Sequence, residues 1–301
     1  MSDDIPCTLS RRRALWLIGS APLFSSCAGT GPIRVASKNF VESVIIAEAY
    51  AASLESASFV VERKMFWGIA QELADGIRNG DIDVYPEYTS SGLMEVLHLR
   101  KPLYDTDDVM RRLRSGYASY RATWLNPSAA HNSQALAVPK YVTSIHNLSQ
   151  CASQAPKLRL AAPDEFLGNV RSDGLVGLRS RYGGFYFRKV ISVKEMGQQY
   201  DELLNGHADV IAVSETDPQI KSNGLRRLKD DLHFWPSYQI APVVSDTVKG
   251  DPKVMHALSK ITARLNQMTL QRLDDEVYDD GRDPADVAHA LVSSINYIGH
   301  S

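Results

Sequence analysis

The chain has little cysteine, with three residues in a total of 301, at positions 7, 27 and 151. Cys7 and Cys27 fall within or at the end of an N-terminal leader, which leaves Cys151 alone in the rest of the chain. A single cysteine has no internal partner for a disulfide. The sequence therefore excludes a disulfide scaffold, and packing must supply the stability of the fold.

Strong charge and short catalytic motifs are also absent. The net charge is −2, without the basic balance that nucleic-acid binding requires, so we exclude a nucleic-acid partner. There is no Gly-x-Ser-x-Gly elbow, no His-Glu-x-x-His, no phosphate loop and no Gly-x-Gly-x-x-Gly after the first strand. The eight histidines lack metal-ligand spacing, so we predict no metal, no cofactor and no enzyme. A hydrolase that uses two cleft carboxylates needs no local motif and stays open.

The N-terminus indicates export. Three arginines, Arg11–Arg13, precede an apolar run at 14–24 that ends in Ser-Ser-Cys at Cys27. The run is too short for a bilayer span of about 20 residues, so residues 1–27 are expected to be a lipoprotein-like signal peptide. We expect a periplasmic or otherwise extracytoplasmic, membrane-anchored protein. Acylation of Cys27 is favoured over simple cleavage, and the Sec and twin-arginine routes both stay open.

About 270 residues remain after the leader, a length at which one core tends to divide into two lobes. Strand patterns alternate with helical ones, which is typical of βαβ units and a mostly parallel sheet. Strands are expected at 33–36, 60–64, 82–85, 158–162 and 190–193. Helices are expected from Asn39, at 71–79, 107–122, 174–182 and 253–272, and from Asp283.

Two polar stretches are interpreted from their neighbouring residues alone, one as a helix cap and the other as a turn. Asn39 and Glu42 have the spacing of a helix capping box, in which the Glu42 side chain returns to the helix N-terminus. The acidic stretch 274–280 with Gly281 fails as a calcium loop, because Tyr278 would occupy the second ligand position. We therefore interpret the acidic stretch as a solvated turn.

A sequence pattern that occurs twice in the chain indicates two similar lobes. The segment 73–84 resembles 203–210, each being a helix end, a glycine and a strand entered through Asp-Val. We predict a first lobe of residues 32–135 with 241–301 and a second lobe of residues 136–240. The apolar runs 135–138 and 240–244 are interpreted as the two crossovers of a hinge. A ligand would then bind between the carboxyl ends of the strands.

The run 82–89 indicates where that ligand binds. An apolar strand stops at Pro86 and presents tyrosines, which is how a cleft acquires an aromatic wall. Tyr85 is interpreted as structural and Tyr88 as part of the wall. This pattern favours a binding protein over a catalyst.

Five motifs in order along the chain carry a family resemblance: 36–40, 81–89, 163–167, 171–175 and 238–244. The chain resembles the substrate-binding proteins of glycine betaine, choline and carnitine ABC importers over nearly all of its length after the leader. The resemblance implies a type II periplasmic-binding-protein fold that closes on a quaternary ammonium solute. It also implies a monomer, without a cofactor, that delivers the solute to a membrane permease.

The resemblance further implies roles for individual residues. Tyr88 and Tyr200 match tyrosines of a cage that holds the ammonium group by cation–π attraction. Lys38 and Arg171 match a clamp for the ligand carboxylate, and Ser91 stands where the family usually has a threonine hydroxyl.

Two cage positions differ from the family pattern. Gln134 and Ser214 stand where tyrosines are usual, and Trp67 with Phe66 is bulky where the family is smaller, so these rings are candidates to fill the gap. Two alternatives remain open beside the cleft hydrolase. They are a binding protein of the same fold for another small solute, and a sensor or adaptor.

Overall fold

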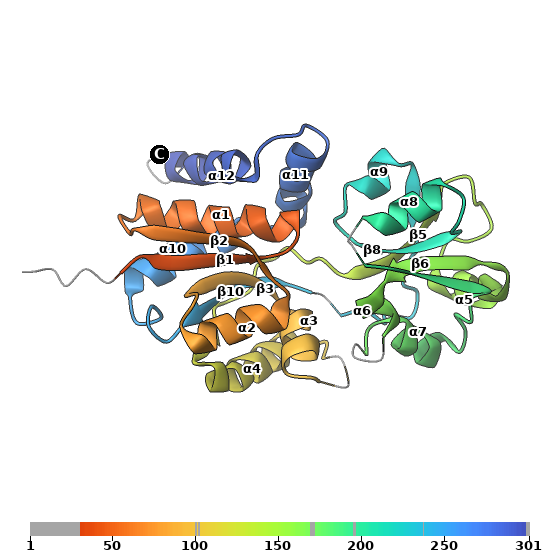
Figure 1. Ribbon diagram of the computed structural model, residues 1–301, viewed down its shortest axis with the longest axis horizontal. Coiled ribbons are helices and arrows are strands. Elements are labelled where there is room, and N and C mark those ends of the chain that lie inside the picture. The colour runs from red at the N-terminus through yellow and green to blue at the C-terminus, as the bar shows by residue number, and fades with distance from the viewer. Residues whose placement is uncertain are drawn as a thin grey trace, which may run out of the picture. The chain divides into compact units, whose positions relative to one another are not determined.

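The computed structural model describes residues 31–99, 101, 103–168, 172–194, 197–236 and 238–298. In these ranges the chain forms two five-stranded mixed sheets, each covered by helices (Figure 1). We call each sheet with its helices a lobe, the first and the second in chain order. The α/β architecture predicted from the sequence is confirmed. The predicted leader with Cys27 lies outside the described residues.

The first sheet has the strand order β2-β1-β3-β10-β4. β1 runs parallel to β2 and β3, whereas β10 is antiparallel to β3 and β4. Its strands are β1 (Ile33–Lys38), β2 (Val61–Gly68), β3 (Val84–Tyr88), β4 (Ala122–Trp124) and β10 (Ile240–Ser245). Its helices are α1 (Val41–Ser56), α2 (Ala70–Asn79), α3 (Thr89–Ser91), the π-helix η1 (Gly92–Val96), α4 (Thr106–Tyr117), the 3-10 turn η2 (Ala118–Tyr120), α10 (Pro252–Thr262), α11 (Gln267–Tyr278) and α12 (Pro284–Ile298).

Helices cover both faces of this sheet, which explains why its inner strands β1, β3 and β10 are buried and largely apolar, whereas the edge strand β2 carries charged residues. On β1, Val35 packs into the core beneath α1, α10, α11 and α12, while the next residue, Ala36, packs into the core beneath α2 and α4 (Figure 1). Successive side chains of a strand point to opposite faces, so a strand covered on both sides must be apolar throughout. Tyr85 is fully buried in the second of these cores, as the structural interpretation expects.

The second sheet has the order β7-β6-β8-β5-β9. Its strands are β5 (Gln134–Pro139), β6 (Arg159–Pro163), β7 (Lys189–Val193), β8 (Val210–Ser214) and β9 (Leu225–Arg227). Its helices are α5 (Leu148–Gln154), the 3-10 turn η3 (Ala155–Lys157), α6 (Asp164–Leu167), α7 (Leu175–Tyr182), α8 (Gln198–Leu204) and α9 (Gln219–Ser222). Cys151 is buried in this lobe as a free thiol.

The two runs interpreted as crossovers are strands of the sheets, so that interpretation was wrong. Residues 135–138 belong to β5 and residues 240–244 to β10. The chain passes between the sheets just before each strand, through 125–133 and 228–239, and the two segments pair there as an antiparallel bridge. The apolar runs are apolar because both faces of the strands are buried. The lobe boundaries at 135 and 240 stay a prediction.

One long helix expected near the C-terminus is two helices. The predicted helix 253–272 is broken at Asn266, whose side chain accepts the Thr269 N–H at 2.9 Å and so caps α11. Apolar periodicity continued across the break because α10 and α11 pack on the same core. None of the helices in the described ranges combines the length and apolar character that a bilayer crossing requires.

The repeated sequence pattern corresponds to a similar ion-pair network in each lobe. In the first lobe, Asp83 accepts from the Arg34 backbone N–H at 3.0 Å and from its Nε and Nη2 at 2.8 and 2.9 Å. Arg34 also donates to the carbonyl of Gly80, which has a positive φ of 79° and ends α2. The Asp83 carboxylate is held further by the hydroxyls of Ser245 and Thr247.

The second lobe repeats this arrangement. Asp209 accepts from the Arg159 backbone N–H at 2.8 Å and from its Nε and Nη2 at 2.9 and 2.6 Å. Arg159 Nη1 donates to the carbonyl of Gly206 at 2.7 Å. The recurring Gly and Asp-Val signature therefore fixes a helix end to the start of a strand in both lobes.

The two copies differ in burial, which predicts different costs of mutation. The Asp83 side chain is 5% exposed and the Asp209 side chain 30%. Asp83→Asn should cost roughly 3 kcal/mol of unfolding free energy because it breaks a buried pair, and Asp209→Asn should cost clearly less. Urea unfolding checks this, and equal costs would contradict it.

The stabilisation that the Asp83 ion pair contributes depends on pH through the pKa of Asp83. Burial alone would raise that pKa, but the bonds from Arg34 outweigh burial and lower it below the ordinary value of 3.8. The stabilisation is therefore present above that value and is lost as the pH falls through the lowered pKa.

Candidate functional site

A cavity of about 450 Å³ lies between the lobes at the carboxyl ends of the central strands. Such a volume suits a small organic molecule. The side chains that line it come from both lobes and from both crossovers. They are Lys38, Asn39, Phe40, Glu42, Ile69, Tyr88, Ser90, Ser91, Glu95, Asn132, Gln134, Pro163, Asp164, Glu165, Lys194, Ser214, Thr216, Asp217, Pro218, Tyr238, Asp274 and Tyr278.

Five of the eight residues predicted for the site line this cavity. Lys38, Tyr88 and Ser91 come from the first lobe, at the end of β1, the end of β3 and in α3. Gln134 and Ser214 come from the second lobe and are paired in register on β5 and β8. The strand ends therefore bring these five together.

Two of the other three, Tyr200 and Trp67, do not line the cavity. Tyr200 packs inside the second lobe, 2% exposed, and the neighbouring Gln199 faces a smaller adjoining cavity instead. Trp67 lies 37% exposed on β2, where the Lys64 ammonium stands 5.3 Å from its ring centroid. Arg171 lies outside the described residues.

Lys38 is buried and already paired. Its Nζ donates to Glu87 Oε1 at 3.0 Å, and the same nitrogen lies 5.5 Å from the ring centroid of Tyr88. Burial raises the pKa of Glu87, and the charge of Lys38 opposes that rise. The positive charge of Lys38 is therefore largely compensated before any ligand arrives.

Tyr88 is the aromatic centre of the first-lobe wall. Its ring is 5% exposed and lies 5.7 Å from that of Phe40, centroid to centroid. The Tyr88 hydroxyl donates to Glu42 Oε1. Burial and the Glu42 carboxylate raise the pKa of Tyr88 well above its ordinary value, so the hydroxyl stays protonated. This hydrogen bond fixes the orientation of the ring.

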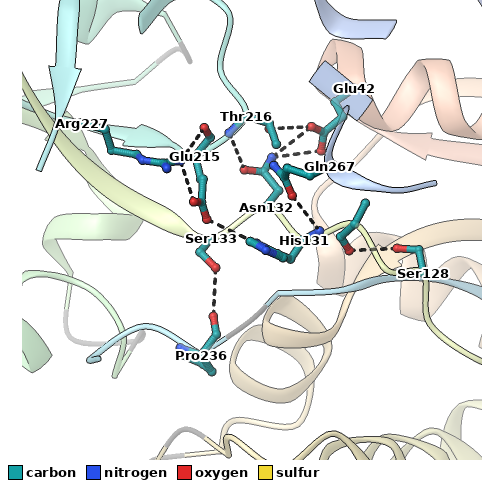
Figure 2. Close-up of polar contacts among 11 residues, drawn as sticks. Glu42, Ser128, His131, Asn132, Ser133, Glu215, Thr216, Arg227, Pro236 and Gln267 are labelled. Carbon is teal, nitrogen blue, oxygen red and sulfur yellow. Dashed lines mark hydrogen bonds and ion pairs between the residues drawn. The ribbon is translucent and has the colours of Figure 1, made fainter. Parts of the chain in front are cut away.

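Glu42 joins three parts of the chain (Figure 2). Besides Tyr88, its carboxylate accepts from Asn132 Nδ2 at 3.0 and 3.2 Å and from Thr216 Oγ1 at 2.8 Å. Asn132 lies on the first crossover and Thr216 in the second lobe. The capping-box interpretation of Glu42 was wrong, because α1 begins after Phe40 without a side-chain cap. The carboxylate binds distant groups in place of its own helix end.

Further polar contacts hold the crossovers (Figure 2). His131 Nδ1 lies 3.4 Å from Glu215 Oε2, and Arg227 pairs with the other oxygen of Glu215 at 2.6 Å. Hydrogen bonding to Glu215 raises the pKa of His131. Ser133 Oγ donates to the Pro236 carbonyl at 3.0 Å, which ties one crossover to the other.

Negative charge predominates in the described cavity lining. It contains two lysines, Lys38 and Lys194, against six carboxylic acids. The acids are Glu42, Glu95, Asp164, Glu165, Asp217 and Asp274. No group of three or more potential ligands among the described residues could hold a metal ion. Such a lining suits an organic cation.

Sequence reasoning missed several of these residues. Asp274 was interpreted as part of a solvated turn, but it lies on α11 and is 2% exposed. Glu42 and Thr216 carried no signal beyond local helix and loop patterns. The four-residue spacing between the buried Leu270 and Asp274 could have indicated that Asp274 faces inward.

Residues 31–294 match the family described as the substrate-binding domain of ABC-type glycine betaine transport systems. The chain belongs to this family. It is 28% identical over 290 residues to a glycine-betaine-binding protein of Pseudomonas aeruginosa, with 92% of each chain covered. It is 26% identical to the glycine betaine-binding protein YehZ of Escherichia coli, with 85% of this chain and 88% of the relative covered.

Solved structures of the family share the fold. A crystal structure described as a glycine betaine/carnitine/choline ABC transporter superposes with a TM-score of 0.71 at 24% identity, over 88% of this chain and 99% of that one. The resemblance to a periplasmic-binding-protein fold, stated from sequence motifs, is thereby confirmed.

Proposed function

We propose that the protein is the extracytoplasmic solute-binding component of an ABC importer and binds a quaternary ammonium solute such as glycine betaine between its lobes. The observation that carries this is the Tyr88 ring, held in the wall of an acidic cavity in a chain of this family. Two relatives named for glycine betaine binding support the ligand class.

The cavity offers two attractions to a methylated cation. Such a cation cannot donate hydrogen bonds, but the face of an aromatic ring attracts it by about 0.5–2 kcal/mol. Tyr88 provides that face, and the carboxylates around it add longer-range attraction. A sugar or an uncharged osmolyte would gain from neither.

For a solute that carries a carboxylate, we propose Lys38, Arg171 and Ser91 as its partners. Lys38 already bonds Glu87, and the Ser91 hydroxyl donates to Glu95 at 3.1 Å. Most of the charge of the clamp would then come from Arg171.

We also propose an oligomeric state, a location in the cell and a partner for the protein. The protein would act as a monomer, exported by its leader and anchored at Cys27, and would deliver solute to a membrane permease without catalysing a reaction. Closure of lobes bounded at residues 135 and 240 about the crossovers would trap the solute.

Calorimetric titration of the purified protein tests the ligand class. Glycine betaine, choline and carnitine should each bind saturably, and sucrose should not. Binding of amino acids or sugars alone would refute the proposal.

The replaced cage positions predict a gain of affinity. Gln134→Tyr or Ser214→Tyr should tighten choline binding by about tenfold, because one added cation–π contact is worth up to about 2 kcal/mol. Ser149→Tyr, on the exposed surface of α5, is the matched control and should change nothing. Unchanged affinity in both cavity variants would place the ammonium group elsewhere.

A further inference from the structure

One carboxylate oxygen of Asp274 receives no hydrogen bond from the described residues. The residue is 2% exposed, it lines the cavity, and no donor among the described residues reaches its buried Oδ1. A buried polar atom left without a hydrogen bond costs about 1–3 kcal/mol. A group from a ligand in the cavity would remove that cost.

Other carboxylic acids surround Asp274. Burial and the Glu42 carboxylate, which lies within hydrogen-bonding reach, raise the pKa of Asp274 well above its ordinary value. Asp217 faces the same pair, and burial raises its pKa too. Lys221, on α9 of the second lobe, lies 3.8 Å from Asp275, the residue after Asp274.

The acceptor lies close to the proposed position of the ammonium group. Tyr88 donates to Glu42, and the same Glu42 carboxylate lies within hydrogen-bonding reach of Asp274. One carboxylate therefore separates the Tyr88 ring from Asp274. Tyr278, which also lines the cavity, lies one helical turn beyond Asp274 on α11.

We propose that Asp274 forms a subsite for a hydrogen-bond donor carried by the ligand, a hydroxyl or an N–H group a short distance from its quaternary ammonium centre. The inference rests on the proposed function and narrows its substrate class. Hydroxylated cations such as choline satisfy the subsite. Glycine betaine has no donor and leaves it empty.

The test compares choline with its O-methyl ether, which keeps the charge and the trimethylammonium group but has no donor. Calorimetry on the purified protein should give choline at least a tenfold tighter affinity, since a site built to bond a hydroxyl discriminates strongly against an analogue that lacks it. Equal affinities would overturn the subsite while leaving the proposed function intact. Absence of binding by both compounds would overturn the subsite, and the proposed function would fail with it only if glycine betaine did not bind either.

Variants assign the preference to Asp274. In Asp274→Leu, the two compounds should bind within about twofold of each other, because the acceptor is gone. Asp275→Leu, next to it on α11 and paired with Lys221, is the matched control and should keep the preference. A preference that survives Asp274→Leu would place the acceptor elsewhere and overturn the assignment. The comparison in the unmodified protein decides the subsite even if Asp274→Leu does not fold.

Discussion

Lys38→Met should destabilise the folded protein by roughly 3 kcal/mol, because it leaves Glu87 buried without its cationic partner. Glu87 is fully buried, its Oε1 bonds Lys38 and the Tyr88 backbone N–H, and its Oε2 has no donor among the described residues. Urea unfolding measures the loss. Lys64→Met, which breaks a half-exposed pair with Glu62, is the matched control and should cost less than about 1 kcal/mol.

The double variant Lys38→Met with Glu87→Met separates stability from binding. Removing both charges should restore most of the stability, since a buried ion pair often contributes no more than apolar residues of similar size. If Lys38 also holds a ligand carboxylate, this stable variant should lose more affinity for glycine betaine than for choline, with each affinity compared with that of the unmodified protein. A double variant as unstable as the single one would contradict the ion-pair explanation.

Tyr88→Ala should weaken the binding of any quaternary ammonium ligand at least 30-fold, because it removes a ring worth up to about 2 kcal/mol together with the wall that it forms. Calorimetric titration measures this, after circular dichroism establishes that the variant is folded. Tyr120→Ala, whose partly buried ring is outside the cavity lining, is the control and should leave affinity unchanged.

Tyr88→Phe divides the effect between the ring and the hydroxyl. It keeps the aromatic face but loses the donor to Glu42, so affinity should fall by no more than about threefold, while stability falls by roughly 1.5–3 kcal/mol for a bond to a charged acceptor. Equal losses of affinity in Tyr88→Phe and Tyr88→Ala would mean that the hydroxyl, and not the ring face, contacts the ligand.

The lobes could be predicted from the sequence because their signals are local. A glycine helix end followed by Asp-Val marks the same corner twice, and in both lobes the aspartate bonds the arginine near the start of a strand. The run 82–89 likewise places Tyr88 just after an apolar strand, and strand ends meet at one edge of a parallel sheet. The expectation that this strand stops at Pro86 was wrong, because β3 runs through the proline to Tyr88 and pairs there with β10. These inferences needed no knowledge of distant contacts.

Other assignments depended on one-residue differences that local patterns do not resolve. Tyr200 and Gln199 are adjacent on α8, and packing against the second sheet decides that the tyrosine turns inward. Short strands such as β4 and β9, with three residues each, are too brief to give a periodic signal.

The sequence by itself determined the α/β class, the repeated helix-to-strand corner and the place of Tyr88 close to the end of an apolar strand, because each follows from periodicity or from neighbours within a few residues. Only the tertiary structure decided the roles of Glu42 and Asp274. Their partners lie far away along the chain, Thr216 being 174 positions from Glu42. The sequence pattern makes Asp274 look like part of a solvated turn, but folding buries it beside the cavity, and burial raises its pKa.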